Sequence, residues 1–449
     1  MRDLISLLAT AVLVGSGAIP GRLNAASPGA DRPPNVLLII SDDQAWTDYG
    51  FMGHPHIRTP HLDRLARESL LFPHGYVPTS LCCPSLASII TGLYPQQTRV
   101  TGNEPPLPPG LNRGQAGRDP RFQAGVARLT HLLDGFPTLP RLLARRGYQS
   151  FQSGKWWMGP YQWGGFTHGM THGDPKRGGR HGDVGLKIGR EGLEPIFDFL
   201  DQTGSRPWLI WYAPFLPHSP HHPPERLLAR YRGLTNSLEV AKYWAMCEWF
   251  DETCGALLDG LDKRGLGDNT LVLYLADNGW IQRPDSPRYR ADSKRSPYDG
   301  GLRTPILVRW RGHLTPRRVE TPVSSIDLAP TVLAACGLPA TPAMCGVNLL
   351  DLDAVRRRRA VFGACFLHNA VVLDVPARNL TWRWCVAGRW KLILPNPVNL
   401  KEPLKPGIPL DAPELYDLRS DPLETRNLAP TQPARVAALT ALLNRWWAP

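Results

Sequence analysis

Runs of apolar residues of strand length recur along the chain and alternate with segments of helical periodicity. The runs at 35–40, 208–213 and 270–276 are continuous, which is typical of strands buried on both faces of a largely parallel sheet. The intervening helical patterns cover Leu62–Leu71, Leu139–Arg146, Gly192–Gln202 and Val240–Arg264. This alternation predicts an α/β fold in which helices flank both faces of a large, mixed, mostly parallel sheet.

The pattern changes near residue 350. Short strand-like runs in RAVFGACF, WRWCVAGRWKLIL and ELYDL are joined by Pro-rich turns, and 434–447 has helical spacing. We therefore expect a catalytic domain over 26–350 and a small antiparallel α+β subdomain over 351–449. The Pro- and Gly-rich segment 102–125 has no periodicity, and it is predicted to be a long surface loop near the substrate entrance.

The first 25 residues have the features of an export signal. A basic residue precedes an apolar run from Leu4 to Ile19, and the Leu-Asn-Ala sequence that ends at Ala25 suits cleavage. We expect a signal peptide at 1–25 and an exported, periplasmic or secreted protein; a membrane anchor is the alternative interpretation. No later segment is apolar enough to cross a bilayer, so no membrane span is expected after the signal is removed.

Eight cysteines could form disulfides in an oxidising compartment. By spacing alone, Cys336 could pair with Cys345, and Cys365 with Cys385. Spacing does not determine the connectivity, and a cysteine consumed by chemistry would leave an odd thiol.

The 449-residue chain has a net charge of +12, which favours acidic partners. Its basic residues are scattered, and the only dense run, Arg356–Arg359, is interpreted as a solvated face. We therefore expect no nucleic-acid partner. Sulfated or phosphorylated molecules fit the charge better.

Polar side chains come soon after four predicted strands, at 35–40, 148–153 (YQSFQS), 208–213 and 270–276. In open α/β sheets, ligands bind at the carboxyl ends of the strands, so these side chains are expected at one edge. A single residue of this kind is more often a helix cap, but the joint placement of several favours a ligand site. The residues expected at this edge are Asp42, Asp43, Lys155, His218, Asp277 and Asn278.

Four of these residues offer only oxygen ligands: Asp42, Asp43, Asp277 and Asn278. Carboxylate and amide oxygens suit Ca²⁺ or Mg²⁺ and not Zn²⁺. The histidines of PHSPHHPP lack a neighbouring cysteine and a His-Glu-x-x-His pattern, which argues against a zinc site. The alternative is that two of the four residues are helix caps and the others are solvated.

A set of motifs in a fixed order gives the chain a family resemblance. The chain resembles the type I, formylglycine-dependent sulfatases, the arylsulfatase family of the alkaline phosphatase superfamily, over nearly the whole mature sequence. The resemblance implies an alkaline phosphatase-like fold and hydrolysis of sulfate esters. The motifs that carry it are NVLLIISDDQ, TPHLDRLARES, CCPSLASIITGLYP, GKWW, PHSP, LADNG, KRSPYDGGLRTPI, DLAPTVLAACGLP and ELYDLRSDPLETRNLA.

The resemblance also implies roles for individual residues. In the family, a cysteine in a Cys-x-Pro-x-Arg motif is oxidised to formylglycine, whose hydrated aldehyde is the nucleophile, and Cys82 has the matching offset to Pro84. The metal is expected to be Ca²⁺, ahead of Mg²⁺, on Asp42, Asp43, Asp277 and Asn278. Lys155, His218 and Lys294 match sulfate-contacting and leaving-group positions, and either Lys294 or His218 would protonate the departing oxygen.

Two positions depart from the family pattern. Leu86 stands where the family has an arginine, and Trp157 stands where relatives usually have a histidine. These departures leave open whether Cys82 is converted, by which oxidising system, and how fast turnover is. The alternatives for Cys82 are a buried thiol or a disulfide, and the side chains considered as compensation are His54, Arg99 and Arg303.

The sequence therefore predicts an exported sulfuric-ester hydrolase that acts on a sulfated small molecule or glycan. Its second partner would be a formylglycine-generating or other cysteine-oxidising maturation enzyme. One alternative keeps the fold but changes the ester, giving a phosphodiesterase or phosphonate monoester hydrolase. A second alternative is a catalytically impaired protein that binds sulfated glycans.

Overall fold

The computed structural model describes residues 32–173 and 179–449. The expected signal peptide at 1–25 lies outside the described residues. Residues 33–449 form one compact unit. None of the helices in the described part of the chain is long and apolar enough to cross a membrane.

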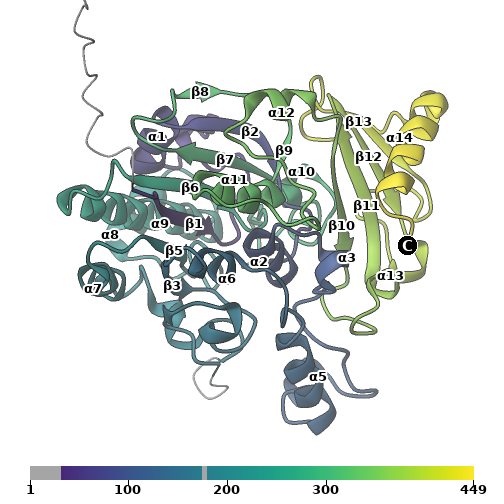
Figure 1. Cartoon of the computed structure of the whole chain (residues 1–449). Coiled ribbons are helices and arrows are strands. Elements are labelled where there is room, and N and C mark those ends of the chain that lie inside the picture. The colour runs from purple at the N-terminus through teal and green to yellow at the C-terminus, as the bar shows by residue number, and fades with distance from the viewer. Residues whose placement is uncertain (1–31, 174–178) are drawn as a thin grey trace, which may run out of the picture. The chain divides into compact units, whose positions relative to one another are not determined.

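A large mixed sheet forms the centre of this unit (Figure 1). Its order is β4-β3-β5-β1-β6-β7-β2-β8, and β9 also pairs with β2, which makes nine strands within the described residues. Pairing is parallel except where β7 runs against β6 and β2. The strands are β1 Asn35–Ser41, β2 Leu70–Tyr76, β3 Gln149–Gly154, β4 His168–Gly169, β5 Trp208–Ala213, β6 Thr270–Ala276, β7 Arg303–Arg309, β8 Arg317–Arg318 and β9 Val323–Ser324.

Helices cover both faces of this sheet, as the sequence predicts. The helices of the described residues are α1 Pro60–Arg67, α2 Cys82–Thr91, α3 Pro95–Thr98, α4 Arg113–Ala116, α5 Pro120–Thr130, α6 Leu139–Ala144, α7 Glu194–Thr203, α8 Glu225–Tyr231, α9 Leu238–Lys263, α10 Asp299–Leu302, α11 Leu328–Ala335, α12 Leu352–Arg357, α13 Pro376–Asn379 and α14 Pro433–Trp446.

Strand β1 shows why its apolar run is continuous. Its side chains alternate between two hydrophobic cores, because successive residues of a strand point to opposite faces. Leu38 packs in the core formed with α2, α6 and α11. Leu37 and Ile39 pack in the core formed with α1, α7 and α9. Each face of the strand is therefore buried under a helical layer, which confirms the predicted architecture.

A second sheet is built from the C-terminal residues. The strands β10 Val361–Phe366, β11 Leu380–Ala387, β12 Trp390–Pro395 and β13 Glu414–Asp417 pair in this order, all antiparallel. On one face Leu392 packs under Leu443 of α14. On the other face Trp384 joins the core of the large sheet. The predicted antiparallel α+β character of this region is confirmed, whereas its separation at residue 350 as a domain stays a prediction.

Two segments differ from the predicted elements. The helix predicted over Leu62–Leu71 ends at Arg67, because Leu70 and Leu71 enter β2 and pair with β7. The segment 102–125 is not entirely loop. Its end contains α4 and the start of α5, whose N-termini are capped by the side chains of Asn112 and Asp119.

All eight cysteines lie within the described residues and are free thiols, so neither proposed disulfide is present. Cys365 and Cys385 lie on the neighbouring strands β10 and β11 but point to opposite faces of the sheet. Cys336 is buried, whereas Cys345 is exposed. Spacing along the chain could not reveal these orientations.

A buried ion pair joins the two sheets. The Lys391 Nζ atom on β12 lies 2.8 Å from Asp299 Oδ1 at the start of α10 and 2.7 Å from Glu424 Oε1. Burial raises the pKa of Glu424 to about 7, against the lowering effect of Lys391. This lysine therefore compensates two buried carboxylates. Its removal leaves Glu424 without this ion pair and leaves Asp299 with Arg303, whose Nη1 atom lies 3.7 Å from Asp299 Oδ2.

We expect Lys391→Met to lower the free energy of unfolding by about 3–5 kcal/mol, the usual cost of breaking a buried pair. The loss should be smaller at pH 5 than at pH 8, because protonated Glu424 needs no counter-charge. Urea-induced unfolding measures both effects. Lys401→Met, which removes an exposed lysine, is the control. Equal stability of the two variants would contradict a stabilising role for Lys391.

Candidate active site

The predicted polar residues meet at one edge of the large sheet. Asp42 and Asp43 follow β1, and Asp277 and Asn278 follow the neighbouring parallel strand β6. Lys155 follows β3, which pairs with β5, the other neighbour of β1. Their meeting at the carboxyl ends of parallel strands is the consequence of this strand order.

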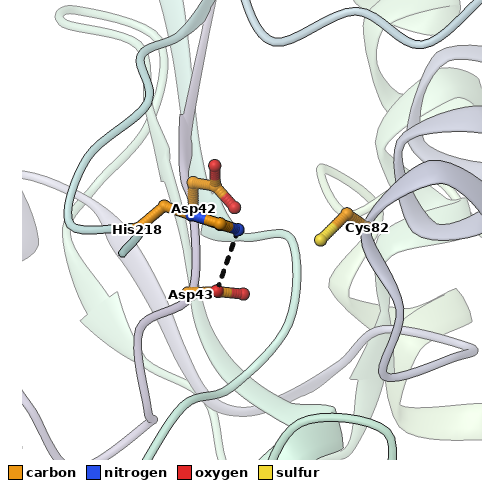
Figure 2. A group of neighbouring side chains, drawn as sticks. All are labelled: Asp42, Asp43, Cys82 and His218. Atoms are coloured by element: carbon orange, nitrogen blue, oxygen red, sulfur yellow. Dashed lines mark ion pairs between the residues drawn. The ribbon is translucent and has the colours of Figure 1, made fainter. Parts of the chain in front are cut away.

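Cys82 and His218 reach the same edge from a helix and a loop. Cys82 is the first residue of α2, and His218 lies in the loop that follows β5. Four potential ligand atoms lie within 4.8 Å of one another, one each from Asp42, Asp43, Cys82 and His218. Figure 2 shows the Cys82 side chain projecting from α2 toward the two aspartates.

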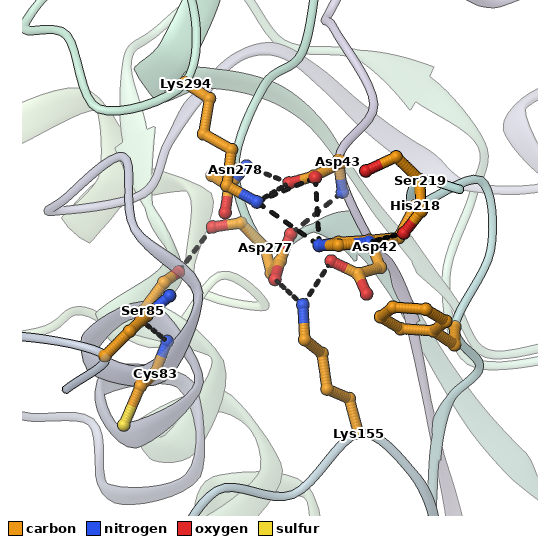
Figure 3. A network of polar contacts seen from close by, with 12 residues as sticks. Asp42, Asp43, Cys83, Ser85, Lys155, His218, Ser219, Asp277, Asn278 and Lys294 are labelled. Atoms are coloured by element: carbon orange, nitrogen blue, oxygen red, sulfur yellow. Dashed lines mark hydrogen bonds and ion pairs between the residues drawn. The ribbon is translucent and has the colours of Figure 1, made fainter. Parts of the chain in front are cut away.

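Two contacts hold the start of α2 in this position. Ser85 Oγ donates a hydrogen bond to the backbone oxygen of Asp277 at 2.6 Å (Figure 3). The Cys83 amide donates to Asn103 Oδ1 at 2.9 Å. The second thiol, Cys83 Sγ, contacts Met158 Sδ at 3.9 Å. The helix that carries Cys82 is therefore fixed to the end of β6.

Two buried lysines compensate the aspartates (Figure 3). Lys155 Nζ lies 2.6 Å from Asp42 Oδ1. Lys294, which comes from the loop before α10, places Nζ at 2.6 and 2.7 Å from the two carboxylate oxygens of Asp43. His218 Nε2 lies 3.3 Å from Asp43 Oδ2. The site thus brings together anionic ligands and the cationic groups that an anionic substrate would require.

Three buried oxygens of the cluster have no hydrogen-bond partner among the described residues: Asp42 Oδ2, Asp277 Oδ2 and Asn278 Oδ1. Asp277 Oδ1 accepts from the Asp43 amide at 3.2 Å, and Asn278 Nδ2 donates to Asp43 Oδ1 at 2.6 Å. Unpartnered buried polar atoms are uncommon and call for an explanation. An all-oxygen set of this kind fits a hard divalent cation such as Ca²⁺ or Mg²⁺.

Burial and charge shift the pKa values of this cluster in different directions. Burial raises the pKa of Asp42 and Asp277, although Lys155 acts against it. For Asp43, burial is outweighed by Lys294 and His218, so its pKa is lowered. Burial also raises the pKa of the Cys82 thiol to about 12. An unmodified Cys82 is therefore a neutral thiol, which is a weak nucleophile.

The two departures from the family pattern lie in packed surroundings. Leu86 is 2% exposed and belongs to the hydrophobic core under α2. The Trp157 ring lies 4.2 Å from the His181 ring, and the Arg180 guanidinium lies over it at 5.3 Å. The His181 ring thus packs at a tilt of 54° against Trp157, which stands where relatives usually have a histidine. Burial and, less strongly, Lys155 lower the pKa of His181 to about 3.

Three side chains could compensate for the missing arginine and histidine of the family pattern, and each of them contacts residues outside the cluster or solvent. Arg303 lies over the Trp46 ring and 3.7 Å from Asp299. The His54 ring packs on Trp244, and Arg99 is exposed.

Sequence reasoning missed several residues near the site. Arg180 forms an ion pair with Glu104 and a hydrogen bond to the backbone oxygen of Asn103, the residue whose side chain contacts the α2 amide. Arg113 also pairs with Glu104, at 3.2 Å. These residues come from aperiodic segments with no motif, so only their contacts identify them.

Solved structures with the same fold include sulfatases and a hydrolase of another ester class. The protein Ps i-CgsB matches with a TM-score of 0.69 and 21% identity, over 93% of both chains. The phosphonate monoester hydrolase of Agrobacterium radiobacter matches with a TM-score of 0.63 and 19% identity, over 92% of this chain and 95% of that one. At these identities the likeness establishes the alkaline phosphatase-like fold.

Sequence comparison is more specific. Human N-acetylgalactosamine-6-sulfatase is 30% identical over 363 residues, and human arylsulfatase A is 28% identical over 374 residues. These alignments cover 72% and 70% of this chain, and 66% of each relative, just under two thirds of its length. The family model described as Sulfatase matches residues 34–338. Because this match spans more than half of the chain and contains every residue of the cluster, the protein belongs to the sulfatase family.

Proposed function

We propose that the protein hydrolyses sulfate esters of sugars, with a nucleophile made from Cys82 and a Ca²⁺ ion held by Asp42, Asp43, Asp277 and Asn278. The observation that supports this most is the set of buried oxygens that have no hydrogen-bond partner among the described residues and lie beside two buried lysines and Cys82. The sugar class rests on the name of the N-acetylgalactosamine-6-sulfatases among the relatives.

The two lysines would serve to bind the sulfate group. Lys155 and Lys294 form ion pairs with Asp42 and Asp43. Bound Ca²⁺ would neutralise these carboxylates and polarise a sulfate oxygen. The ammonium groups would then be available to a sulfate, where each favours the charge that develops on the oxygens.

Proton transfer to the leaving oxygen falls to Lys294 or His218. Lys294 Nζ and His218 Nε2 lie 3.5 Å apart and both face Asp43, so one substrate oxygen could approach either donor. Formylglycine at Cys82 would supply a hydrated aldehyde as the nucleophile toward sulfur. The net reaction consumes one water and yields an alcohol and sulfate.

Maturation and export complete the proposal. The maturation partner would be a formylglycine-generating or other cysteine-oxidising enzyme that acts on the segment around Cys82. The signal-like sequence at 1–25 supports export to a periplasmic or secreted location.

Leu86 favours a second candidate function. This position carries an apolar, buried side chain in place of the family's arginine, and an unmodified Cys82 would remain a neutral thiol. Under this alternative the protein binds sulfated glycans through Lys155, Lys294 and the metal without cleaving them. The chemical state of Cys82 distinguishes the two functions.

We expect the tryptic peptide Glu68–Arg99, from protein made in its native host, to have lost the sulfur of Cys82 and to carry an aldehyde. Mass spectrometry and trapping with a hydrazide probe measure this change. Cys83 should remain a thiol and serves as the internal control. Two intact thiols in the peptide would favour the binding function instead.

Asp277→Asn should weaken Ca²⁺ binding roughly tenfold or more, about 1.4 kcal/mol, because it removes a ligand charge without changing the side-chain size. Isothermal titration calorimetry with CaCl₂ measures this affinity. The control is Asp268→Asn, which removes a carboxylate that is 89% exposed. A parental affinity in the Asp277 variant would contradict the assignment of this residue as a metal ligand.

The proton donor can be identified by comparing two substrates whose leaving groups differ in their need for protonation. We expect His218→Gln and Lys294→Met to slow hydrolysis of a sulfated sugar by roughly 10²–10⁴-fold. The variant that lacks the donor should lose less activity on an aryl sulfate, whose leaving oxygen needs less protonation. Steady-state kinetics on both substrates measure these losses, with His222→Gln as the control for an exposed histidine of the same loop. Losses no larger than the control would exclude both residues as donors.

A further inference from the structure

A cationic cavity lies between the two sheets. It has a volume of about 670 Å³ and shares no lining residue with the candidate active site. Its walls come from the end of α12, the β11–β12 turn, the residues after β13, and β2 with 320–322. We call it the arginine groove, after the lining residues Arg356, Arg358, Arg359, Arg389 and Arg419.

The run Arg356–Arg359 is largely exposed, in agreement with its interpretation as a solvated face, and three of its residues also line this cavity. Arg356, Arg358 and Arg359 line one side of a cavity, and the fold brings Arg389 and Arg419 to it from the second sheet. The last two residues lie on either side of the β12–β13 pair, so no local sequence pattern links them to the run. The cluster is a product of tertiary structure.

Three of these arginines have an acidic partner. Arg358 pairs with the buried Asp327. Arg356 lies 2.7 Å from Asp353, and Arg389 lies 3.3 Å from Asp417. These pairs hold the side chains in place and neutralise part of the positive charge of the groove.

The described part of the chain does not neutralise the remaining charge. The guanidinium groups of Arg359 and Arg419 are exposed and have no acidic partner among the described residues. The acidic residue in the lining, Glu320, already contacts His74 at 3.2 Å and Arg318 at 2.6 Å. The groove therefore presents two free guanidinium groups beside three paired ones, which favours an anionic ligand.

Guanidinium groups bind sulfate, phosphate and carboxylate oxygens through paired hydrogen bonds. A groove of this volume is within the range of sites that hold small organic ligands or a few sugar units. Its apolar lining includes Pro322, Val386 and Leu418, whereas Tyr76 is fully buried. The described lining thus offers no exposed Phe, Tyr or Trp ring for stacking nucleic-acid bases.

We propose that the arginine groove is a second binding site for a sulfated polysaccharide, separate from the site of hydrolysis. The choice of a sulfated chain rests on the proposed function, because a sulfatase of sugars encounters polymers that carry many sulfates. The groove would hold one part of the polymer and raise the local concentration of its other sulfates around the enzyme.

The test compares two charge-matched double variants. Arg359→Glu/Arg419→Glu reverses the free charges of the groove, and Arg67→Glu/Arg145→Glu reverses two exposed arginines on α1 and after α6. Both are made in the full chain with Cys82→Ala, so that the probe is not consumed. The probe is a heparin fragment of defined length, and fluorescence anisotropy gives its Kd between about 50 and 200 mM salt.

We expect the groove variant to bind the heparin fragment roughly tenfold or more weakly, with a flatter salt dependence, because fewer counterions are released. The control should stay within about twofold of the parent. Equal binding by the groove variant and the parent would overturn the proposal, and so would an equal loss in the control. Equal or tighter binding of single-stranded DNA of the same charge would overturn the assigned ligand class.

Hydrolysis of a small sulfate ester separates this proposal from the proposed function. With Cys82 restored, the groove variant should cleave the small ester at the parental rate, because neither arginine belongs to the candidate active site. Absence of hydrolysis in the parent would refute the proposed function, whereas the heparin measurement would still decide the groove.

Discussion

The structure depends on the burial of three aspartates at one edge of its central sheet. Asp42, Asp43 and Asp277 are each at most 2% exposed, and their mutual repulsion acts in a place from which water is excluded. Such a cluster is stable only when cations compensate it. Lys155 and Lys294 supply this compensation directly, and a divalent ion would do so more completely.

This requirement explains much of the surrounding architecture. Lys155 follows β3, the strand next to β5, and Lys294 comes from the loop that precedes α10, and from these positions each lysine reaches one of the two aspartates. The helix α2 is tied to Asp277 through Ser85, which places Cys82 at the helix N-terminus beside the cluster. The positive end of this helix favours an anion at the same place. Substrate charge, metal charge and helix dipole therefore act together in the proposed function.

Buried charges are also paired where the second sheet meets the large sheet. Lys391 compensates Asp299 and Glu424 where this sheet joins the large one, so an electrostatic contact accompanies the shared hydrophobic core. At the same junction, the groove contains two exposed arginines that have no acidic partner among residues 32–173 and 179–449. The protein thus neutralises its charges inside the junction and leaves positive charge free where the junction opens to solvent.

The sequence by itself determined the fold class and most of the cluster. Continuous apolar runs specify strands with two buried faces, and Asp42 and Asp277 follow such strands directly. Lys155 follows the more polar strand β3, and the three residues converge because their strands are parallel and end at the same edge of the sheet. The resemblance to the family motifs identified Cys82 and Lys294 as further members of the candidate site.

Tertiary structure alone decided the contacts between segments that have no periodicity. His181 reaches Trp157, Arg180 reaches Glu104, and Arg419 joins the groove through packing that no local pattern encodes. It also decided which face each cysteine occupies, and so excluded the disulfides that spacing allowed. Periodicity determines which residues are buried, whereas the partner of a buried or charged side chain depends on how distant segments pack.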